Sequence, residues 1–216
     1  MDIDQLRRDA EAPVVAGPGD IAAVAADLAD AFRDDDMFDW FMRPDSRRDQ
    51  AFARFFSFLV RMGARDGGLI ERPAVGGAAA IWMPFEAVGP MSMMDEIRAA
   101  PTILFSAGLA RVPRVLALQA AINKHHPTDR PHAYLWFLGV APALQGHGLG
   151  SRLLAAANAR LDAEGLPAYL ETGTTRNVAL YRRHGFEVIS HGRPRPDAPP
   201  LWTMWRDPKA DGAFAA

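Results

Sequence analysis

Cysteine is absent from the 216 residues of the sequence. The chain therefore forms no disulfide bond, offers no thiolate ligands for zinc and has no cysteine on which an acyl-enzyme could form. No apolar run approaches the ~18 residues that span a bilayer. The amino terminus, Met1-Asp2-Ile3-Asp4, carries two acidic residues, unlike the basic and apolar start of a signal peptide. These absences predict a cytoplasmic protein that does not enter a membrane.

A strong excess of one charge is also missing. Lys and Arg number 24, Asp and Glu number 26, and the formal net charge is −2. Without a basic surface, neither nucleic acid nor anionic lipid is an expected partner. Hydrophobic residues make up 49% of the chain and charged residues 23%, which is enough apolar material for a core. The length fits one domain, and we expect residues 1–216 to form it.

The first half of the chain has the pattern of helices followed by strands. One helix is predicted after the N-cap residue Asp20 and a second from about Ser46, with a buried stripe formed by Phe52, Phe55, Phe56 and Leu59. Two short strands, 69–75 and 77–83, are expected to turn at Gly76 and Gly77.

Residues 91–126 are rich in Ala, Leu and Met and mostly helical in pattern. Pro101 and Pro113 are expected to break this segment into two or three helices, because proline interrupts the helical hydrogen bonds. We expect a helical insertion between two strands of one sheet. It would serve as a lid over a substrate site or as the contact face of a homodimer.

The second half alternates strands and helices. The nearly continuous apolar run 133–140 predicts a strand buried on both faces. It is followed by glycines and a helix containing Leu153 to Leu161. Next come a strand at 168–172, a short helix at 178–184, and strands at 186–190 and 201–205. The order predicts an α/β fold. A ligand is expected where the glycine loop meets the first of these helices.

Three alternate glycines, Gly146, Gly148 and Gly150, precede that helix directly. Glycine lets the backbone approach a ligand, and the helix start supplies unpaired N–H groups and partial positive charge. Together they predict a pyrophosphate site, with a glycine-rich turn that binds nothing as the alternative.

Two other phosphate motifs compare less well with this loop. A P-loop requires a lysine that this loop lacks. The dinucleotide fingerprint matches Gly146, Gly148 and Ser151, with Glu171 about 20 residues on. However, five residues separate Gly146 from its strand, and too little sequence follows for a second nucleotide-binding half.

Three motifs follow one another in the second half of the chain: Leu138-Gly139-Val140-Ala141-Pro142, then Gln145-x-x-Gly148-x-Gly150, then Asn177 through Tyr181 to Gly185-Phe186. Their order and spacing are specific. From about Ala133 to Ser190 the chain resembles the GCN5-related N-acetyltransferase (GNAT) superfamily. The resemblance implies a GNAT-like acyl-CoA N-acyltransferase fold, an α+β arrangement with a mixed sheet. Acetyl-CoA would bind between its two splayed, central parallel strands. The helical insertion between strands 3 and 4 departs from the minimal family pattern.

The resemblance also implies residue roles. The backbone groups of Phe137, Leu138 and Val140 are expected to hold the pantetheine arm, their side chains belonging to the core. The pyrophosphate is expected on the N–H groups of Gln145, Gly146, His147, Gly148, Leu149, Gly150 and Ser151. Asn177 and Tyr181 are expected near the thioester.

Two residues are catalytic candidates. An ammonium group must lose a proton before it attacks, and the departing thiolate must gain one. Tyr181 is the candidate acid, with a role as an aromatic core residue as the alternative. Glu171 is the candidate base, since a carboxylate in an apolar strand needs a reason to be there. The alternatives are a loop-orienting carboxylate paired with Arg176, or a chain of water molecules as the base.

Three further features of the sequence are candidates for a role at the acceptor site or a metal site. The acidic run Asp34 to Asp36, with Asp39, follows the first predicted helix and would either attract a cationic amine or form a solvated loop. The residues just beyond it, from Trp40 to Met42, would line an acceptor pocket or simply pack. His125 and His126 diverge in any regular element and have no His or Cys partner in motif spacing, so we expect no metal.

The sequence thus predicts an acetyl-CoA-dependent N-acetyltransferase acting by direct attack in a ternary complex. The expected acceptor is a primary amine of a small molecule, with a protein amine less favoured. A non-catalytic acyl-CoA sensor on the same fold and an NAD-dependent oxidoreductase are the competing functions.

Overall fold

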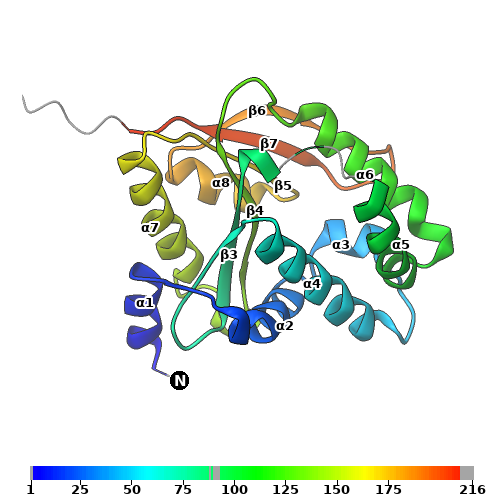
Figure 1. The fold of residues 1–216 in the computed structure, drawn as a ribbon, viewed down its shortest axis with the longest axis horizontal. Helices are drawn as coiled ribbons and strands as arrows, with labels where there is room; N and C mark the ends of the chain where they lie inside the picture. Colours follow the sequence, from blue (N-terminus) through cyan, green and yellow to red (C-terminus); the bar gives the residue numbers. More distant parts are fainter. Residues whose placement is uncertain (1, 88, 90–92, 210–216) are drawn as a thin grey trace, which may run out of the picture.

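The computed structural model of the chain describes residues 2–87, 89 and 93–209. Within them a seven-stranded mixed sheet has the order β1-β2-β3-β4-β5-β7-β6 (Figure 1). The strands are β1 (Val14–Val15), β2 (Leu69–Arg72), β3 (Ala78–Pro84), β4 (Ala133–Val140), β5 (Ala168–Thr172), β6 (Glu187–Gly192) and β7 (Leu201–Arg206). The helices are α1 (Ile3–Glu11), α2 (Ile21–Ala31), α3 (Asp36–Phe41), α4 (Arg48–Arg65), α5 (Met93–Ala107), α6 (Val112–His125), α7 (Leu149–Ala163) and α8 (Thr175–Arg183).

The strands and helices of the second half match the sequence prediction closely. The bounds of β4 and β5 agree with the predicted runs, and both Gly76 and Gly77 have positive φ at the predicted turn. The sequence analysis did not identify α1, β1 or α3. These elements are short, so their periodicity is weak and they depend on packing against the rest of the fold.

Two helices, α5 and α6, lie between β3 and β4 in the chain, where helices were predicted. Residue 91, at which the predicted insertion begins, lies outside the described residues. The predicted break at Pro101 is wrong, because Pro101 lies inside α5. Pro101 is exposed, and so is Ile97 one turn before it, whose carbonyl is the one that proline leaves unpaired. Water can hydrogen bond to this carbonyl, so the helix continues. Pro113 lies in the first turn of α6, where its missing N–H removes no helical bond.

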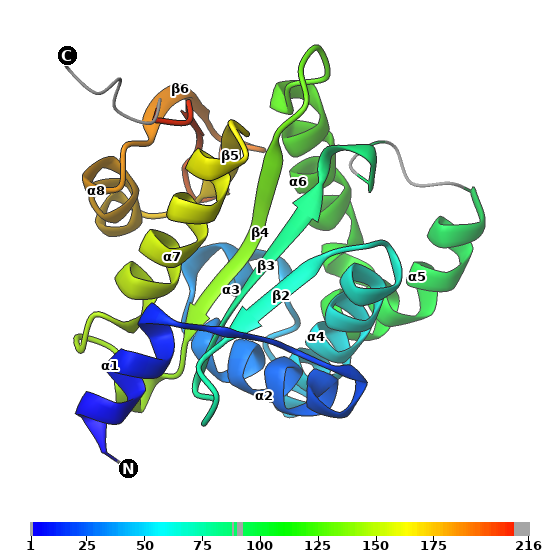
Figure 2. The same cartoon turned by 60° about the vertical axis from the view of Figure 1, so that its left-hand side comes forward.

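The sheet divides between β4 and β5. The two strands pair in parallel over only three positions, of which the last is Leu135 with Leu170. Directly beyond this point the pairing of β4 with β3 shifts register, and Trp136 is the extra residue. A bulge increases local twist, and Figure 2 shows β5 to β7 diverging from β2 to β4. We call the resulting opening between β4 and β5 the V.

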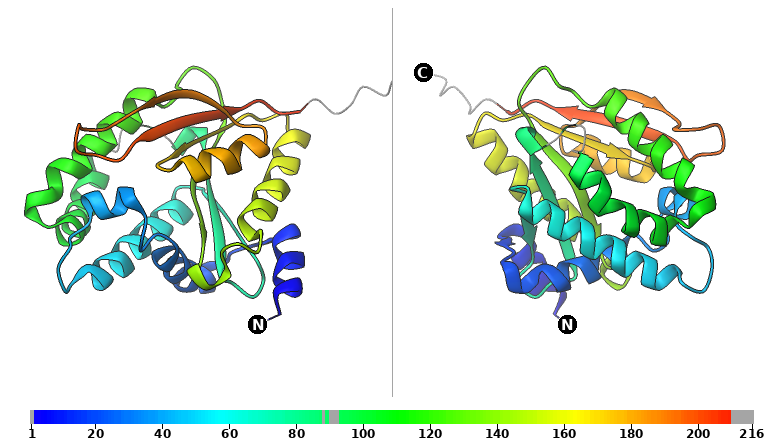
Figure 3. Two further views of the ribbon diagram at one scale, coloured as in Figure 1. Left: turned by 180° about the vertical axis from the view of Figure 1, so that it is seen from behind. Right: turned by 45° about the vertical axis from the view of Figure 1, so that its right-hand side comes forward.

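Helices cover both faces of the sheet. One apolar cluster includes Val24 and Leu28 of α2 with Phe52 and Phe56 of α4, and another includes Leu154 of α7. Residues of α1 pack against α7, at the opposite end of the molecule from α5 and α6 (Figure 3). The V therefore opens in a sheet that has a separate apolar cluster on each of its two faces.

The approach of α2 to β4 requires a glycine at position 139. A Cβ there would lie 2.7 Å from Leu28 Cδ2 and 2.9 Å from the Ala31 Cβ. Both distances are shorter than a carbon–carbon contact allows. Gly139 therefore lets α2 lie directly on the free part of β4.

Among the described residues, no single helix is long and apolar enough to cross a membrane. Only the stretches Met93–Ala107 and Leu109–His125 taken together meet that criterion of length and composition, and they are bent by 106°.

Candidate active site

The glycine loop leads directly into the N-terminus of α7. Gly146 and Gly148 have φ of +82° and +80°, in the left-handed region that glycine adopts without a Cβ clash. Gly148 is the N-cap residue of α7, and no side chain caps this end. Its first N–H groups are therefore left for another acceptor, and the helix dipole adds positive charge there. An anion such as a pyrophosphate fits this end of the helix.

The neighbouring loop residues are held by two hydrogen bonds. The side chain of Gln145 donates from Nε2 to the Val140 carbonyl at 3.1 Å. Arg7 of α1 donates from Nε to the His147 carbonyl at 3.3 Å. One of the two Val140 backbone groups is therefore already bonded, which leaves its N–H for the predicted pantetheine contact. Arg7, which also pairs with Asp4 at 2.9 Å, thus links α1 to the loop, a contact that the sequence pattern did not reveal.

The side chains of Leu149 and Ser151 have structural partners. Leu149 is buried in the cluster between α1 and α7. The Ser151 hydroxyl lies 2.6 Å from Nε2 of His184 at the end of α8, and burial lowers the pKa of His184. Only the main chain of Leu149 is therefore available to an anion, and Ser151 links α7 to α8.

The β4 residues predicted to bind through their backbone have side chains in apolar clusters. The Phe137 ring lies 5.7 Å from Phe32 and 5.5 Å from Phe56, edge to face. Leu138 packs against the clusters on the α7 side. Beyond Leu135 the edge of β4 that faces β5 has no ladder partner in β5. That edge is where an extended arm would add as a strand.

Asn177 and Tyr181 lie on α8, on the α7 side of the sheet. The Thr174 hydroxyl accepts the Asn177 N–H and caps this helix. Tyr181 is 6% exposed, and its ring packs 5.8 Å from Phe186. Burial raises the pKa of Tyr181 well above its usual value. The phenol is therefore a protonated donor at neutral pH.

Glu171 follows the last residue that pairs β5 with β4, so it lies where the V begins. Its side chain is 7% exposed, and Oε1 is 3.8 Å from Nδ1 of His126. The pKa of Tyr134 and that of Tyr169 are raised, first by burial and then by the Glu171 carboxylate. The contact is therefore with His126 rather than with Arg176, the partner weighed from the sequence.

His126 belongs to a buried pair that the sequence analysis missed. Its Nε2 lies 3.0 Å from Nε2 of His132, and His132 is 1% exposed. His125 turns away toward Ser190 at 3.4 Å, so the two adjacent histidines diverge as predicted. His132 directly precedes the apolar strand β4, and this was the one sequence signal of its burial. Within the described part of the chain, no group of three or more His, Asp or Glu side chains is arranged to hold a metal.

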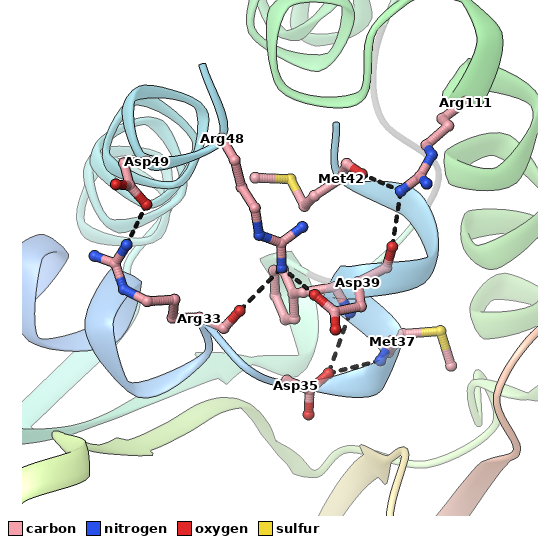
Figure 4. Close-up of polar contacts among 9 residues, drawn as sticks. Arg33, Asp35, Met37, Asp39, Met42, Arg48, Asp49 and Arg111 are labelled. Atoms are coloured by element: carbon pink, nitrogen blue, oxygen red, sulfur yellow. Dashed lines mark hydrogen bonds and ion pairs between the residues drawn. The ribbon is translucent and has the colours of Figure 1, made fainter. Parts of the chain in front are cut away.

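The acidic run follows α2, as predicted, and it also starts the next helix, α3, which was not predicted. Asp35 is the N-cap residue of α3, and its carboxylate accepts the N–H groups of Met37 and Phe38 (Figure 4). Asp39 forms an ion pair with Arg48. Negative charge at a helix N-terminus is stabilising, so local structure explains residues that had suggested attraction of a cationic substrate.

Trp40 of α3 is tied to two distant segments. Its Nε1 donates to Asp197 at 3.1 Å, in the loop between β6 and β7. Arg114 of α6 pairs with the same carboxylate at 3.2 Å and donates to the Trp40 carbonyl at 2.8 Å. Arg111 donates to the carbonyls of Asp39 and Met42 (Figure 4). Three segments thus meet at Trp40.

This junction lies beside the end of β5. A Cβ on Gly173, two residues after Glu171, would lie 3.7 Å from the Met37 Cβ and 3.7 Å from the Pro200 carbonyl oxygen. The end of β5, two residues beyond Glu171, is therefore bordered by α3 and by the loop between β6 and β7.

The sequence model of the acetyltransferase (GNAT) family matches residues 26–186, three quarters of the chain. The chain belongs to the GNAT family of acetyltransferases. This confirms the resemblance carried by the three motifs, and it makes the chain an acyltransferase. The family assignment decides against the NAD-dependent alternative.

Solved structures of acetyltransferases have the same fold. A histone acetyltransferase HPA2 and related acetyltransferase from Corynebacterium glutamicum aligns with a TM-score of 0.67 at 24% identity, over 93% of this chain and 98% of that one. A mosquito arylalkylamine N-acetyltransferase like 5b gives 0.58 at 15%, over 90% and 98%. The Drosophila melanogaster polyamine N-acetyltransferase gives 0.56 at 18%, over 90% and 99%. At these identities the likeness establishes the fold, and this GNAT enzyme shares it over nearly its whole length.

Proposed function

We propose that this GNAT enzyme transfers the acetyl group of acetyl-CoA to a primary amine of a small molecule. The amine attacks directly while both substrates are bound. One observation carries the proposal: the pairing of β4 with β5 ends at Leu135 and Leu170, the buried carboxylate of Glu171 follows directly, and Tyr181 packs in the same apolar cluster as that last pair. The N-terminus of α7, which also packs against this part of the sheet, has no side-chain cap. An anion site and an acid–base pair are the two requirements of this transfer.

The donor side fits CoA through the backbone. The N–H groups from Gln145 to Ser151 would hold the pyrophosphate at the start of α7, with Arg7 close to the loop. The free edge of β4 from Phe137 to Val140 would receive the pantetheine arm as an added strand. Asn177, on the first turns of α8, would lie near the thioester. Acetyl-CoA supplies the activated acyl group.

Glu171 and Tyr181 approach the V from opposite faces of the sheet. Tyr169 belongs to the apolar cluster of α2 and α4, and Leu170 to that of α7 and α8. Because side chains alternate along a strand, Glu171 shares the face of Tyr169, whereas Tyr181 packs in the cluster of Leu170. Glu171 would accept a proton from the ammonium group, and Tyr181 would donate one to the departing sulfur.

The acceptor would enter on the Glu171 side, past α3 and the loop between β6 and β7. Met37 and Pro200 border this side, and Trp40 fixes the two segments together through Asp197. The related folds described as polyamine and arylalkylamine N-acetyltransferases support a small amine as acceptor. A protein amine is the competing acceptor.

Two measurements test the proposal. Calorimetry should give saturable binding of acetyl-CoA, and no binding at high micromolar concentration would overturn it. Free-thiol release should then be assayed with polyamines, arylalkylamines, amino acids, aminoglycosides and a peptide with a free amino terminus. Release with a small amine supports the proposal, and release with the peptide alone would transfer it to protein acceptors. Binding without release from any of them would favour a non-catalytic acyl-CoA sensor.

A further inference from the structure

The histidine pair beside Glu171 has a defined proton arrangement. His132 Nδ1 lies 3.0 Å from the Arg130 carbonyl oxygen, which can only accept, so Nδ1 carries a proton. Burial lowers the pKa of His132, which favours the neutral ring. Nε2 of a neutral His132 is then an acceptor, and the proton between the two rings belongs to Nε2 of His126.

This arrangement leaves a lone pair directed toward Glu171. A His126 ring with a single proton carries it on Nε2, so its Nδ1 has the lone pair, and this atom faces Glu171 Oε1 across 3.8 Å. Both atoms are buried and lack a hydrogen-bond partner. Two facing acceptors in a buried site are unfavourable until a proton comes between them. A hydrogen bond needs the two atoms only about 0.8 Å closer.

The transfer reaction requires a route for one proton. An alkylammonium nitrogen loses two protons on becoming an amide N–H. One ends on the CoA sulfur, and the other must reach solvent. Glu171, which would take that proton, is 7% exposed, so direct loss to water is obstructed.

The far end of the histidine pair meets an opening. His132 lines a cavity of about 190 Å³ with Phe85, Glu86, Pro131, Ala133 and Arg160. Glu86 and Pro131 are exposed, so this cavity reaches the surface. It lies where β4 begins, whereas the V opens beyond Leu135.

We propose that His126 and His132 form a proton relay that connects Glu171 to this cavity. The relay deepens the proposed function and rests on it. A protonated Glu171 passes its proton to Nδ1 of His126, whose Nε2 proton moves to Nε2 of His132. His132, now doubly protonated, releases its Nδ1 proton to water in the cavity. His126 then carries its proton on Nδ1 and His132 on Nε2. Before the next turnover each ring rotates to water, gives up that proton and takes one on its other nitrogen, which restores the starting tautomers. The two histidines act through Glu171 and touch neither substrate.

Titratable and charged side chains surround the relay at both of its ends. Glu171, Tyr134 and Tyr169 lie at its inner end, and Arg130, Arg160 and Glu86 lie around His132. The guanidinium of Arg130 is turned over the Trp205 ring and pairs with Asp207 at 3.4 Å. It is therefore partly neutralised beside the ring that must carry the proton.

Chemical rescue of His132→Ala tests the relay. We expect this variant to bind acetyl-CoA normally and to lose about tenfold or more in kcat, within the range for proton transfer by a positioned group. Added imidazole should restore much of the loss, because the cavity leads to the vacated position. Pyrazole, which has the same size and is far less basic, should not. His126→Ala should be slowed similarly, and the double variant should be no slower than either single variant.

His125→Ala is the matched control, since His125 is the exposed neighbour that turns toward Ser190. A kcat for His132→Ala equal to that of His125→Ala would overturn the relay, and so would equal rescue by pyrazole. Either result leaves the proposed function standing if the wild type releases thiol. A wild type inactive with every amine overturns both.

A measurement without turnover covers the case in which the alanine variants do not fold. Nitrogen-15 NMR of the wild-type protein should find His132 protonated on Nδ1 and His126 on Nε2. A His126 ring with its proton on Nδ1 would contradict the relay. His126→Gln, which retains an N–H donor toward His132 but no basic atom toward Glu171, should be as slow as His126→Ala.

Discussion

On the proposed donor side of the V, the pyrophosphate and the pantetheine arm would bind one continuous stretch, residues 137–151, whereas the proposed acceptor side is assembled from separate segments. On the donor side the strand edge, the glycine loop and the start of α7 succeed one another along the chain. On the acceptor side, Glu171 of β5 meets His126 after α6, and Trp40 of α3 meets Asp197 between β6 and β7.

The difference lies in what each side presents to its substrate. The donor side offers backbone N–H groups and a helix dipole, which follow from the local conformation of glycine and a helix start. The acceptor side offers side chains whose positions depend on packing between distant elements. Substitutions on the two sides should therefore act on different parameters.

The largest effect is expected for Glu171→Gln on the acceptor side. Loss of the base should lower kcat by about 10³-fold and leave acetyl-CoA binding unchanged, as measured by thiol release and calorimetry. Glu187→Gln, an exposed carboxylate of β6, is the control. Equal kcat values for the two variants would assign the base to water.

Tyr181→Phe should lower kcat less, by about 10²-fold. Thiols have a pKa of about 8.5, so the sulfur leaves with less need of an acid. Val178→Ala, in the same apolar cluster of α8, controls for lost packing. If both variants slow turnover only in proportion to their loss of stability, Tyr181 is a core residue.

On the donor side, Gly148→Ala should affect binding. Its φ of +80° costs a residue with a Cβ about 1–2 kcal/mol, and the distorted helix start should raise the Kd of acetyl-CoA about tenfold, or ~1.4 kcal/mol. Gly165→Ala, at the other end of α7 with φ of +63°, should lose similar stability and keep its affinity. Calorimetry and thermal unfolding separate the two effects. Equal Kd values would show that the loop does not bind the cofactor.

The smallest effect is expected for Asp197→Ala. Release of Trp40 and Arg114 should raise the KM for the amine by up to about fivefold, since an exposed ion pair contributes little, while the Kd of acetyl-CoA stays the same. Asp207→Ala is the control. It breaks a matching set in which Trp205 donates to Asp207 at 2.8 Å and Arg130 pairs with it. If the two variants change KM equally, the junction at Trp40 does not border the acceptor.

The sequence predicted the bounds of β4 and β5 because long apolar runs ended by proline or glycine allow little else. It wrongly predicted a helix break at Pro101, which lies inside α5 because the exposed side of a helix tolerates proline. It correctly placed Asp35 after a helix but did not predict that Asp35 also starts α3, because a six-residue helix has too little periodicity to detect.

The sequence by itself determined the family, the mixed sheet and the glycine loop at the start of α7. Each depends on motifs that are contiguous in the chain, where local backbone preferences decide the structure. Only the tertiary structure brought His132 to His126 and His126 to Glu171. That arrangement depends on how the end of α6 packs against β4 and β5, and on a buried carboxylate that finds its partner 45 residues earlier in the chain.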